Sequence, residues 1–409
     1  MSQRGIPMRH KTSLLLLLCV FVVLLSGCWD REELQQLSIV SGMAIDKGSD
    51  AVKNRYKVTV QIINPSQVAG GQQGGKVQAS PVTTFTETGS TLSETLRKIS
   101  TKSPGELFFP HLQVLVIGEK VAKEGIEDLF DIIERDAQFR VLFPVLIARG
   151  NATAKEMLEV TTSLEAIPSA KIGDALKSSE EDWGAYKSTR ADQVIQGLKE
   201  GSLVVTGVEI DGETKSGNTT TNTQQISPSA QIEIKGMALF KNGKLENWLD
   251  GHAARGGTWI TNEMKRTVMN LNCGKKKEAT AIEISRAKSA TDVKIKHQKP
   301  VIYITVHAEG AVLENNCSKD LGKSQVLGQL DEELEEEIKQ EVLLTVKKAQ
   351  KQKSDIFNFG EKVNMADKRV WKNIETSWEK DIFPETEVHV NVQAIIRRTG
   401  MTTKSYINK

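Results

Sequence analysis

The sequence predicts an α+β protein in which mixed sheets are packed with helices. Three patterns predict this class: a strand, a helix and a strand follow one another over residues 112–148, a run of strands begins near residue 267, and a long amphipathic helix covers 331–353. The 409 residues are 39% apolar and 26% charged, which is typical of a soluble globular protein with two or three domains.

The first residues form a positive start, with Arg4, Arg9 and Lys11, followed by an apolar run over 14–25. As a helix this run spans roughly 18 Å, well short of the ~30 Å hydrocarbon core, so it predicts a cleaved secretory signal over residues 1–27. The sequence Ser26-Gly27-Cys28 resembles a bacterial lipobox. We therefore predict cleavage between Gly27 and Cys28, and an extracytoplasmic lipoprotein with S-diacylglycerol, and possible N-acylation, on Cys28.

The charge balance supports a lipid anchor. Removing residues 1–27 takes away three basic and no acidic residues, which changes 54 basic and 52 acidic residues to 51 and 52. A near-neutral surface disfavours nucleic acid and broad electrostatic adhesion to lipid. The acylated Cys28 is therefore expected to hold the chain on the outer face of a membrane.

Residues 28–200 are expected to form an N-terminal α/β domain. The short connections from strand 112–117 through helix 126–133 to strand 141–148 predict parallel pairing. A flexible loop is expected over 70–75. The other expected elements are strands 38–45 and 56–62 and helices 91–99, 153–158 and 192–198.

Residues 201–265 are expected to form a middle β-rich domain. Strands are expected over 203–210 and 232–240, and Asn242-Gly243 supplies the turn of a hairpin. Residues 211–229 are rich in Ser, Thr, Asn and Gly, which predicts a mobile loop.

Residues 266–409 are expected to form a C-terminal α+β domain. Helix 331–353 has acidic first turns and basic last turns, which complement the helix dipole. Lysines near 275–277 and 294–299 are expected to make one β-region basic, either as solvated hairpin tips or as a contact for anionic headgroups. The expected strands are 268–271, 280–286, 293–297, 301–313 and 387–397.

Cys273 and Cys317 are the two cysteines that remain besides Cys19 of the leader and the anchor. An oxidising compartment permits a disulfide between them. If the three expected strands between them form a simple meander, the cysteines fall at opposite ends of the sheet, beyond the ~7 Å Cα separation that a bridge requires. We therefore expect no bridge.

The sequence contains no set of residues typical of an enzyme. It has no H-E-x-x-H, G-x-S-x-G or C-x-x-C motif, and the six histidines are not spaced as metal ligands. Gly322-Lys323-Ser324 resembles the end of a P-loop, but Cys317 stands where that loop needs its first glycine. We expect no catalytic activity, metal or cofactor.

Four stretches occur in a specific order. They are Cys28-Trp-Asp-Arg-Glu-Glu33, then Gly236-Met-Ala-Leu-Phe-Lys-Asn-Gly-Lys-Leu245, then Asp355-Ile-Phe-Asn-Phe-Gly360, and finally Trp371-Lys372, Trp378 and Arg397-Arg-Thr-Gly400. Together they resemble the C-subunit lipoproteins of spore germination receptors, the Ger(x)C family. The resemblance covers essentially the whole chain after the leader.

This resemblance implies a three-domain α+β lipoprotein that is no enzyme. It implies one subunit of a nutrient germinant receptor in the spore inner membrane, assembled with two integral-membrane subunits, A and B. Direct nutrient binding is usually ascribed to a membrane subunit. The sequence does not indicate which nutrient is sensed.

The last stretches supply the candidate site residues, Asp355, Gly360, Trp371, Trp378, Arg397 and Gly400. Asp355 is expected to cap or orient the turn that follows it, and Gly360 to supply a backbone angle that other residues resist. Trp371 and Trp378 are seven residues apart, hence on one helical face. Core packing is the favoured role of the two tryptophans, and docking of the A or B subunit is the alternative.

Two other classes of protein were weighed. A solute-binding lipoprotein of a transporter needs two similar α/β lobes, whereas strand–helix–strand units are expected only in the first half here. A cell-wall hydrolase lacks the catalytic residues.

Overall fold

The computed structural model describes residues 36–68, 80–273, 276–317 and 320–398. The predicted leader and the predicted anchor at Cys28 fall in residues 1–35, outside the described residues, as do Gly400 and the loop predicted over 70–75. Within the described ranges, no helix is both long and apolar enough to cross a bilayer.

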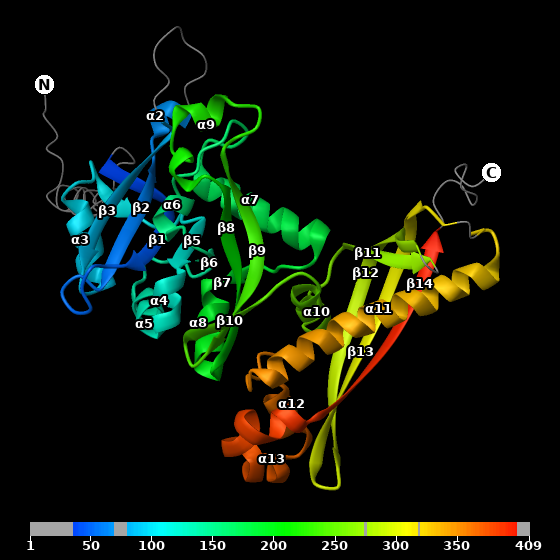
Figure 1. Cartoon of the computed structure of the whole chain (residues 1–409). Helices are drawn as coiled ribbons and strands as arrows, with labels where there is room; N and C mark the ends of the chain where they lie inside the picture. Colours follow the sequence, from blue (N-terminus) through cyan, green and yellow to red (C-terminus); the bar gives the residue numbers. More distant parts are fainter. Residues whose placement is uncertain (1–35, 69–79, 274–275, 318–319, 399–409) are drawn as a thin grey trace, which may run out of the picture.

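Two separate sheets organise the chain, one in each half of the sequence (Figure 1). This is the expected α+β class. The larger sheet has the order β10-β9-β8-β6-β5-β1-β2-β3, with β4 beside β1 and β7 beside β6. Its strands are β1 (Leu37–Lys47), β2 (Tyr56–Ile63), β3 (Val82–Gly89), β4 (Glu106–Phe108), β5 (Val114–Gly118), β6 (Pro144–Ala148), β7 (Thr189–Arg190), β8 (Ser202–Gly212), β9 (Ala230–Lys241) and β10 (Lys244–Leu249).

Helices cover both faces of the larger sheet. One apolar core lies under α3 (Leu92–Ser100), α4 (Glu119–Glu124), α5 (Glu127–Arg135) and α8 (Ala191–Glu200). The other lies under α6 (Ala154–Met157) and α7 (Pro168–Ser178). The short α2 (Pro65–Val68) follows β2.

Most expected elements of the N-terminal half are confirmed. Thr91 caps α3 by accepting a hydrogen bond from the Glu94 N–H, and Thr153 caps α6 in the same way. Strands β5 and β6 pair in parallel across α5, as expected. The helix α7, which starts at Pro168, was missed because Ile172 and Leu176 are its only two large apolar residues, too few to reveal a helical period in the sequence.

The strands expected in a middle domain extend the larger sheet. β8 pairs in parallel with β6 and antiparallel with β9, and the β9–β10 turn places Asn242 and Gly243 at φ +48° and +71°. The hairpin is confirmed. The division at residues 200 and 265 stays a prediction, but residues 202–249 do not form a sheet of their own.

The segment over 211–229 was expected to be a mobile loop, and this expectation was wrong. It contains a 3-10 turn (Thr214–Ser216) and α9 (Thr220–Gln224). The buried Asn222 amide donates hydrogen bonds to the carbonyls of Thr161 and Ala230. The Asn222 amide therefore ties this segment, which has little apolar surface to bury, to the neighbouring backbone.

The second sheet has the order β11-β12-β13-β14. Its strands are β11 (Thr267–Cys273), β12 (Lys276–Lys296), β13 (Lys299–Asn315) and β14 (Glu387–Arg398). Strand β12 is continuous where two strands were expected, and it forms one long hairpin with β13. Lys276 and Lys277 therefore lie at the opposite end of β12 from Lys294 and Lys296, roughly 55 Å away, and the two groups do not make one basic region.

The continuous hairpin also explains why the expectation of no disulfide was wrong. Cys273 and Cys317 are bridged, with Cα atoms 6.1 Å apart. Two strands, and not three, separate the cysteines, so the chain returns to the end of the sheet where it started. Thr280 of β12 is opposite Asn315 of β13, two residues before Cys317.

The long helix α11 (Ser324–Lys351) packs across one face of the second sheet. It begins seven residues before the expected start at Asp331, so its first turn carries no acidic residue, and the dipole argument fails at that end. Strand β14 is parallel to β13, so a strand–helix–strand crossover occurs in this half too, contrary to expectation.

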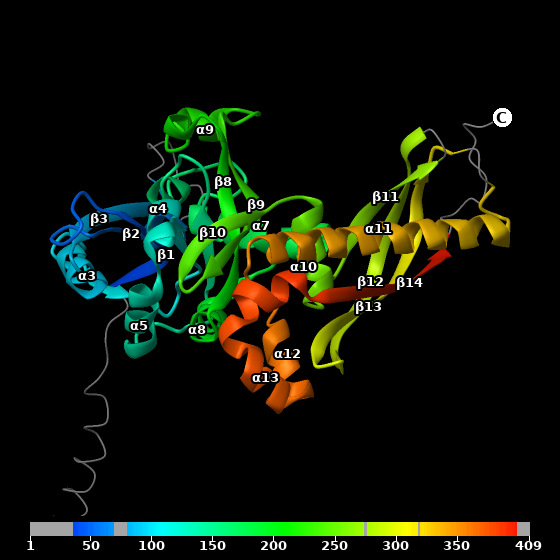
Figure 2. The same ribbon diagram turned by 60° about the horizontal axis from the view of Figure 1, so that its bottom comes forward.

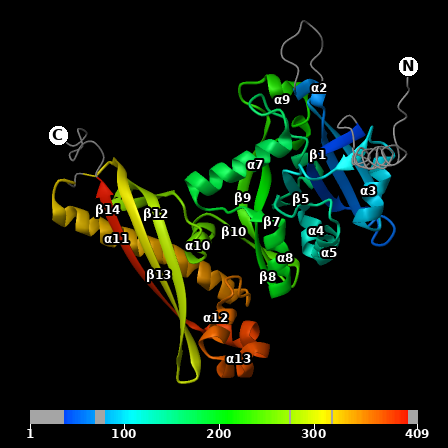
Figure 3. The same ribbon diagram turned by 180° about the vertical axis from the view of Figure 1, so that it is seen from behind.

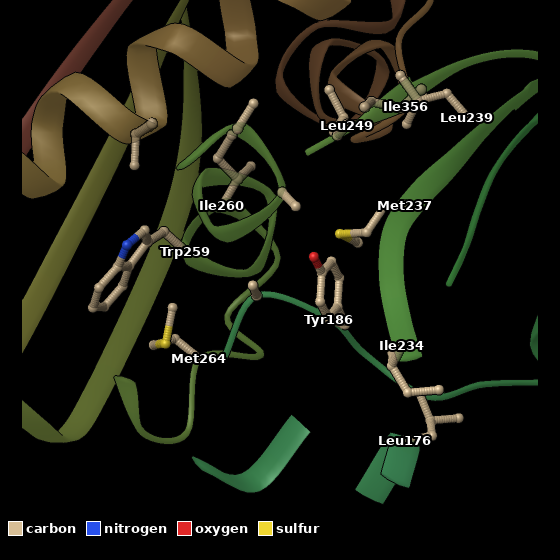
Figure 4. Packing of buried hydrophobic residues seen from close by; sticks show 14 of the residues in the cluster. Leu176, Tyr186, Ile234, Met237, Leu239, Leu249, Trp259, Ile260, Met264 and Ile356 are labelled. Atoms are coloured by element: carbon tan, nitrogen blue, oxygen red, sulfur yellow. The ribbon is translucent and has the colours of Figure 1, made fainter. Parts of the chain in front are cut away.

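A buried helix joins the two halves. α10 (His252–Ile260) follows β10 and lies between the two sheets, as the different views show (Figures 2 and 3). Trp259, Ile260 and the following Met264 belong to the same apolar cluster as Tyr186 and Met237 of the N-terminal half, and the Trp259 ring points away from those two residues, toward the second sheet (Figure 4). One apolar core therefore runs through both halves.

Candidate interaction site

The candidate site residues, which we call the signature residues, begin at Asp355, shortly after α11 ends at Lys351. Asp355 is 5% exposed, and its carboxylate accepts hydrogen bonds from the N–H groups of Phe359 and Gly360, at 3.0 and 2.7 Å. These residues open α12 (Phe359–Ala366), so Asp355 orients this turn as expected. The indole N–H of Trp378 donates a third hydrogen bond to the same carboxylate, at 2.8 Å.

Burial raises the pKa of the Asp355 carboxyl above its usual range, and the three N–H donors act in the opposite direction. The same carboxylate thus fixes the start of α12 and the position of an indole 23 residues later. Removing it would leave three buried donors without a partner.

The two tryptophans meet edge to face. Trp371 lies on α13 (Lys368–Ile374) and Trp378 opens a π-helical turn (Trp378–Ile382), with ring centroids 5.7 Å apart. The helix between them is interrupted by a 3-10 turn (Glu375–Ser377), so they do not share one regular helical face. Trp378 is 3% exposed and packs on Phe383, whereas Trp371 is only partly buried.

Gly360 has a different role from the one expected. Its φ is not left-handed, but a Cβ at this position would lie 2.7 Å from Cη2 of Trp371 and 2.8 Å from Nε1 of Trp378. The residue must therefore be small because the two indoles pack against its backbone. The left-handed residue of this turn is Asn358, at φ +54°.

Asn358 connects the two halves of the molecule, a role that sequence reasoning missed. Its side-chain amide donates to the Glu200 carboxylate at 2.6 Å, and its Oδ1 lies 2.8 Å from the Ser202 hydroxyl. A nearby ion pair, Lys241 with Glu379 at 2.9 Å, links the same two regions. The available signal was an asparagine between two aromatic residues, since Asn tolerates left-handed backbone better than most residues.

The remaining signature residues lie elsewhere. Arg397 on β14 forms a two-point ion pair with Glu309 on β13, with both N–O distances at 2.7 Å. This pair is exposed on the sheet and is not part of the turn. Gly400 and Cys28 lie outside the described residues.

A groove of about 590 Å³ runs beside the turn from Asp355 to Gly360, and we call it the signature groove. Asp355, Gly360 and both tryptophans line one side of it. Glu200 and Ser202 of the N-terminal half line the other side. A larger cavity of about 810 Å³ lies between the halves and shares Glu200, Ser202 and Asn358 with the groove.

A second polar cluster lies between α10 and α11. The buried Glu341 carboxylate binds the Arg255 guanidinium and accepts a hydrogen bond from the Trp259 indole at 3.1 Å. His252, Glu337 and Glu341 bring metal-type ligand atoms within 4.8 Å of one another. Because Arg255 already balances the Glu341 charge, we assign this cluster to helix pairing.

These features define a class: a two-sheet α+β protein whose most distinctive residues build an aromatic groove at the junction of its halves. The sequence matches the family models described as "Spore germination protein N-terminal domain", over residues 30–210, and "Spore germination B3/ GerAC like, C-terminal", over residues 235–400. The chain belongs to the Ger(x)C family of spore germination proteins, as the ordered stretches indicated.

Individual relatives agree with this assignment. The chain is 32% identical to spore germination protein KC of Bacillus subtilis, over 96% of this chain and 97% of the relative. It is 24% identical to spore germination protein B3 of the same organism, over 93% and 96%. The crystal structure of the GerBC protein is similar in fold, with a TM-score of 0.54 and 21% identity over 89% of this chain and all of that one.

The family assignment gives the chain a role in spore germination. Its family consists of germinant receptor subunits and is not a known class of enzyme. Membership also indicates association with a receptor complex and with a membrane.

Proposed function

We propose that this chain is the lipid-anchored C subunit of a nutrient germinant receptor that acts in the initiation of spore germination. The observation that carries the proposal is the match of both family models over most of the chain, behind a predicted leader that ends in Ser26-Gly27 directly before Cys28. The ectodomain stands on the outer face of the spore inner membrane and assembles with integral-membrane A and B subunits.

The anchor follows from the physical character of the chain. The described helices offer no membrane span, and the chain after the leader is nearly neutral. Neither a hydrophobic helix nor a general surface charge therefore holds the described body at a bilayer. Two or three acyl chains on Cys28 supply stable attachment where one chain would be marginal.

The signature groove is the proposed contact for a membrane subunit. Trp371 presents part of an indole beside exposed polar residues, and aromatic residues are enriched at protein interfaces. Trp378 and Asp355 shape the groove from beneath, since both are buried. Trp378 thus serves core packing, and Trp371 is the tryptophan that contacts the partner.

Two measurements on protein from the native host test the proposal. Intact-mass analysis should show a chain that begins at Cys28 and carries diacylglycerol. A tagged chain solubilised in mild detergent should copurify with two multi-span membrane proteins, and the variant Cys28→Ala should lose the membrane fraction. An unmodified Cys28, or a retained leader, contradicts the anchor; failure of the wild-type chain to copurify with membrane proteins contradicts the assembly.

The transporter alternative is set aside. The family models describe spore germination proteins, and none of the relatives reported above is named as a solute-binding protein.

A further inference from the structure

The rim of the signature groove has an excess of carboxylates. Glu200, Glu361 and Glu375 line the groove, and in the described part of the chain none of them forms an ion pair. Of the two lysines there, Lys241 is neutralised by Glu379, and Lys380, which is exposed like the three glutamates, balances at most one of them. The groove therefore carries net negative charge that the chain itself does not balance.

The floor of the groove is aromatic. Trp371 is partly exposed and lines the groove, held in place by the edge-to-face contact with Trp378. A guanidinium or ammonium group binds favourably over an indole face, and most favourably where carboxylates lie close by. Arginine suits such a site best because its planar group both stacks on an aromatic ring and binds carboxylates at two points.

From this combination we infer that the signature groove binds an arginine or lysine side chain presented by an extramembrane segment of a partner subunit. The inference rests on the proposed function, which supplies the partner. The groove of about 590 Å³ is larger than one cationic head requires, and it continues into the 810 Å³ cavity past Asn358. That space accommodates the residues that flank the cation in a protein segment. Trp and Arg are also the residues that dominate binding energy at protein interfaces.

Calorimetry on the full lipidated chain in detergent tests the inference with defined probes. The tripeptide acetyl-Arg-Arg-Arg-amide should bind saturably at low salt, and acetyl-Glu-Glu-Glu-amide should not. The double variant E361Q/E375Q should weaken binding at least fivefold at an unchanged melting temperature, and W371F should weaken it about threefold. The matched control E314Q/E332Q removes two exposed carboxylates elsewhere and should leave the affinity unchanged.

The inference is overturned if both peptides bind alike, if neither binds, or if E361Q/E375Q and its control weaken binding equally. A parallel test in the host uses the charge reversal E361K/E375K. If the wild-type chain and E361K/E375K copurify with the membrane subunits equally well, the cation site is refuted and the proposed function stands. Wild-type chain that fails to copurify refutes the proposed function, and the peptide titrations still decide the chemistry of the groove.

Discussion

The side-chain amide of Asn358 lies 2.6 Å from the carboxylate of Glu200, across the junction between the two halves of the molecule. Asn358 holds a left-handed backbone at φ +54° to make this contact. The contact and the start of α12 are thus set by one short turn. Loosening this turn is expected to affect how the C-terminal helices sit on the N-terminal sheet.

Replacing Asn358 tests this connection. N358G keeps the backbone angle but loses the hydrogen bonds to Glu200 and Ser202, so we expect a loss of about 1–2 kcal/mol of unfolding free energy. N358A adds the left-handed strain of a residue with a Cβ, about 1 kcal/mol more. Urea unfolding measures both, with the exposed Asn391→Ala on β14 as control. Equal stability of N358G and wild type would show that the contact contributes nothing.

Gly360 provides a test of close packing. In G360A the new Cβ would lie 2.7 Å from Cη2 of Trp371 and 2.8 Å from Nε1 of Trp378, so we expect a loss of about 1–3 kcal/mol and an altered near-UV circular dichroism spectrum. Gly173 in α7 is the control, because a Cβ there would meet no other part of the chain within 4 Å, and G173A should be neutral or stabilising by up to about 1 kcal/mol. A neutral G360A would mean that the two indoles move aside freely.

The disulfide gives a prediction for the second sheet. In oxidised protein, neither Cys273 nor Cys317 should react with a thiol reagent until a reductant is added. The bridge spans 44 residues, for which the loop-entropy model gives about 4 kcal/mol, so C273S/C317S should lower the unfolding free energy by up to that amount. Prompt labelling of both cysteines under non-reducing, native conditions would contradict the bridge.

The sequence predicted features that depend on contacts between neighbouring residues better than features that depend on contacts between residues far apart in the chain. Local signals were sufficient for the Thr91 cap of α3 and the Asn242-Gly243 hairpin, because neighbouring residues determine both. They were insufficient for β12, where the sequence predicted two strands with a break over residues 287–292, although pairing with β13 keeps the strand continuous. Because three strands were expected between Cys273 and Cys317 where there are two, the cysteines were expected at opposite ends of the sheet and the disulfide was not predicted.

The candidate site shows the same division. The motif from Asp355 to Gly360 indicated a structured turn, and the capping by Asp355 was predicted because its donors lie within five residues. The requirement at Gly360 comes from indoles 11 and 18 residues away, and the role of Asn358 comes from a carboxylate 158 residues away. No local pattern encodes such contacts, so Gly360 was assigned a backbone role that the structure gives to Asn358.

Glu94 should make the stability of α3 depend on pH. Its carboxylate binds Lys98 and accepts hydrogen bonds from the N–H and hydroxyl of Ser90, and these contacts, Lys98 first, lower its pKa from the usual value to about 2. Because the folded pKa is depressed, the stabilisation is fully present above the unfolded value near 4.3 and is lost as the pH falls through the folded value. The difference in unfolding free energy between wild type and E94Q should therefore be constant from pH 7 to about pH 5 and shrink below that. Urea titrations at a series of pH values measure it, with the exposed Glu106→Gln as control. A difference that stays constant down to pH 3 would show that E94Q acts through something other than the charge of Glu94, because a carboxylate that titrates between these two pKa values must lose part of its advantage over that interval.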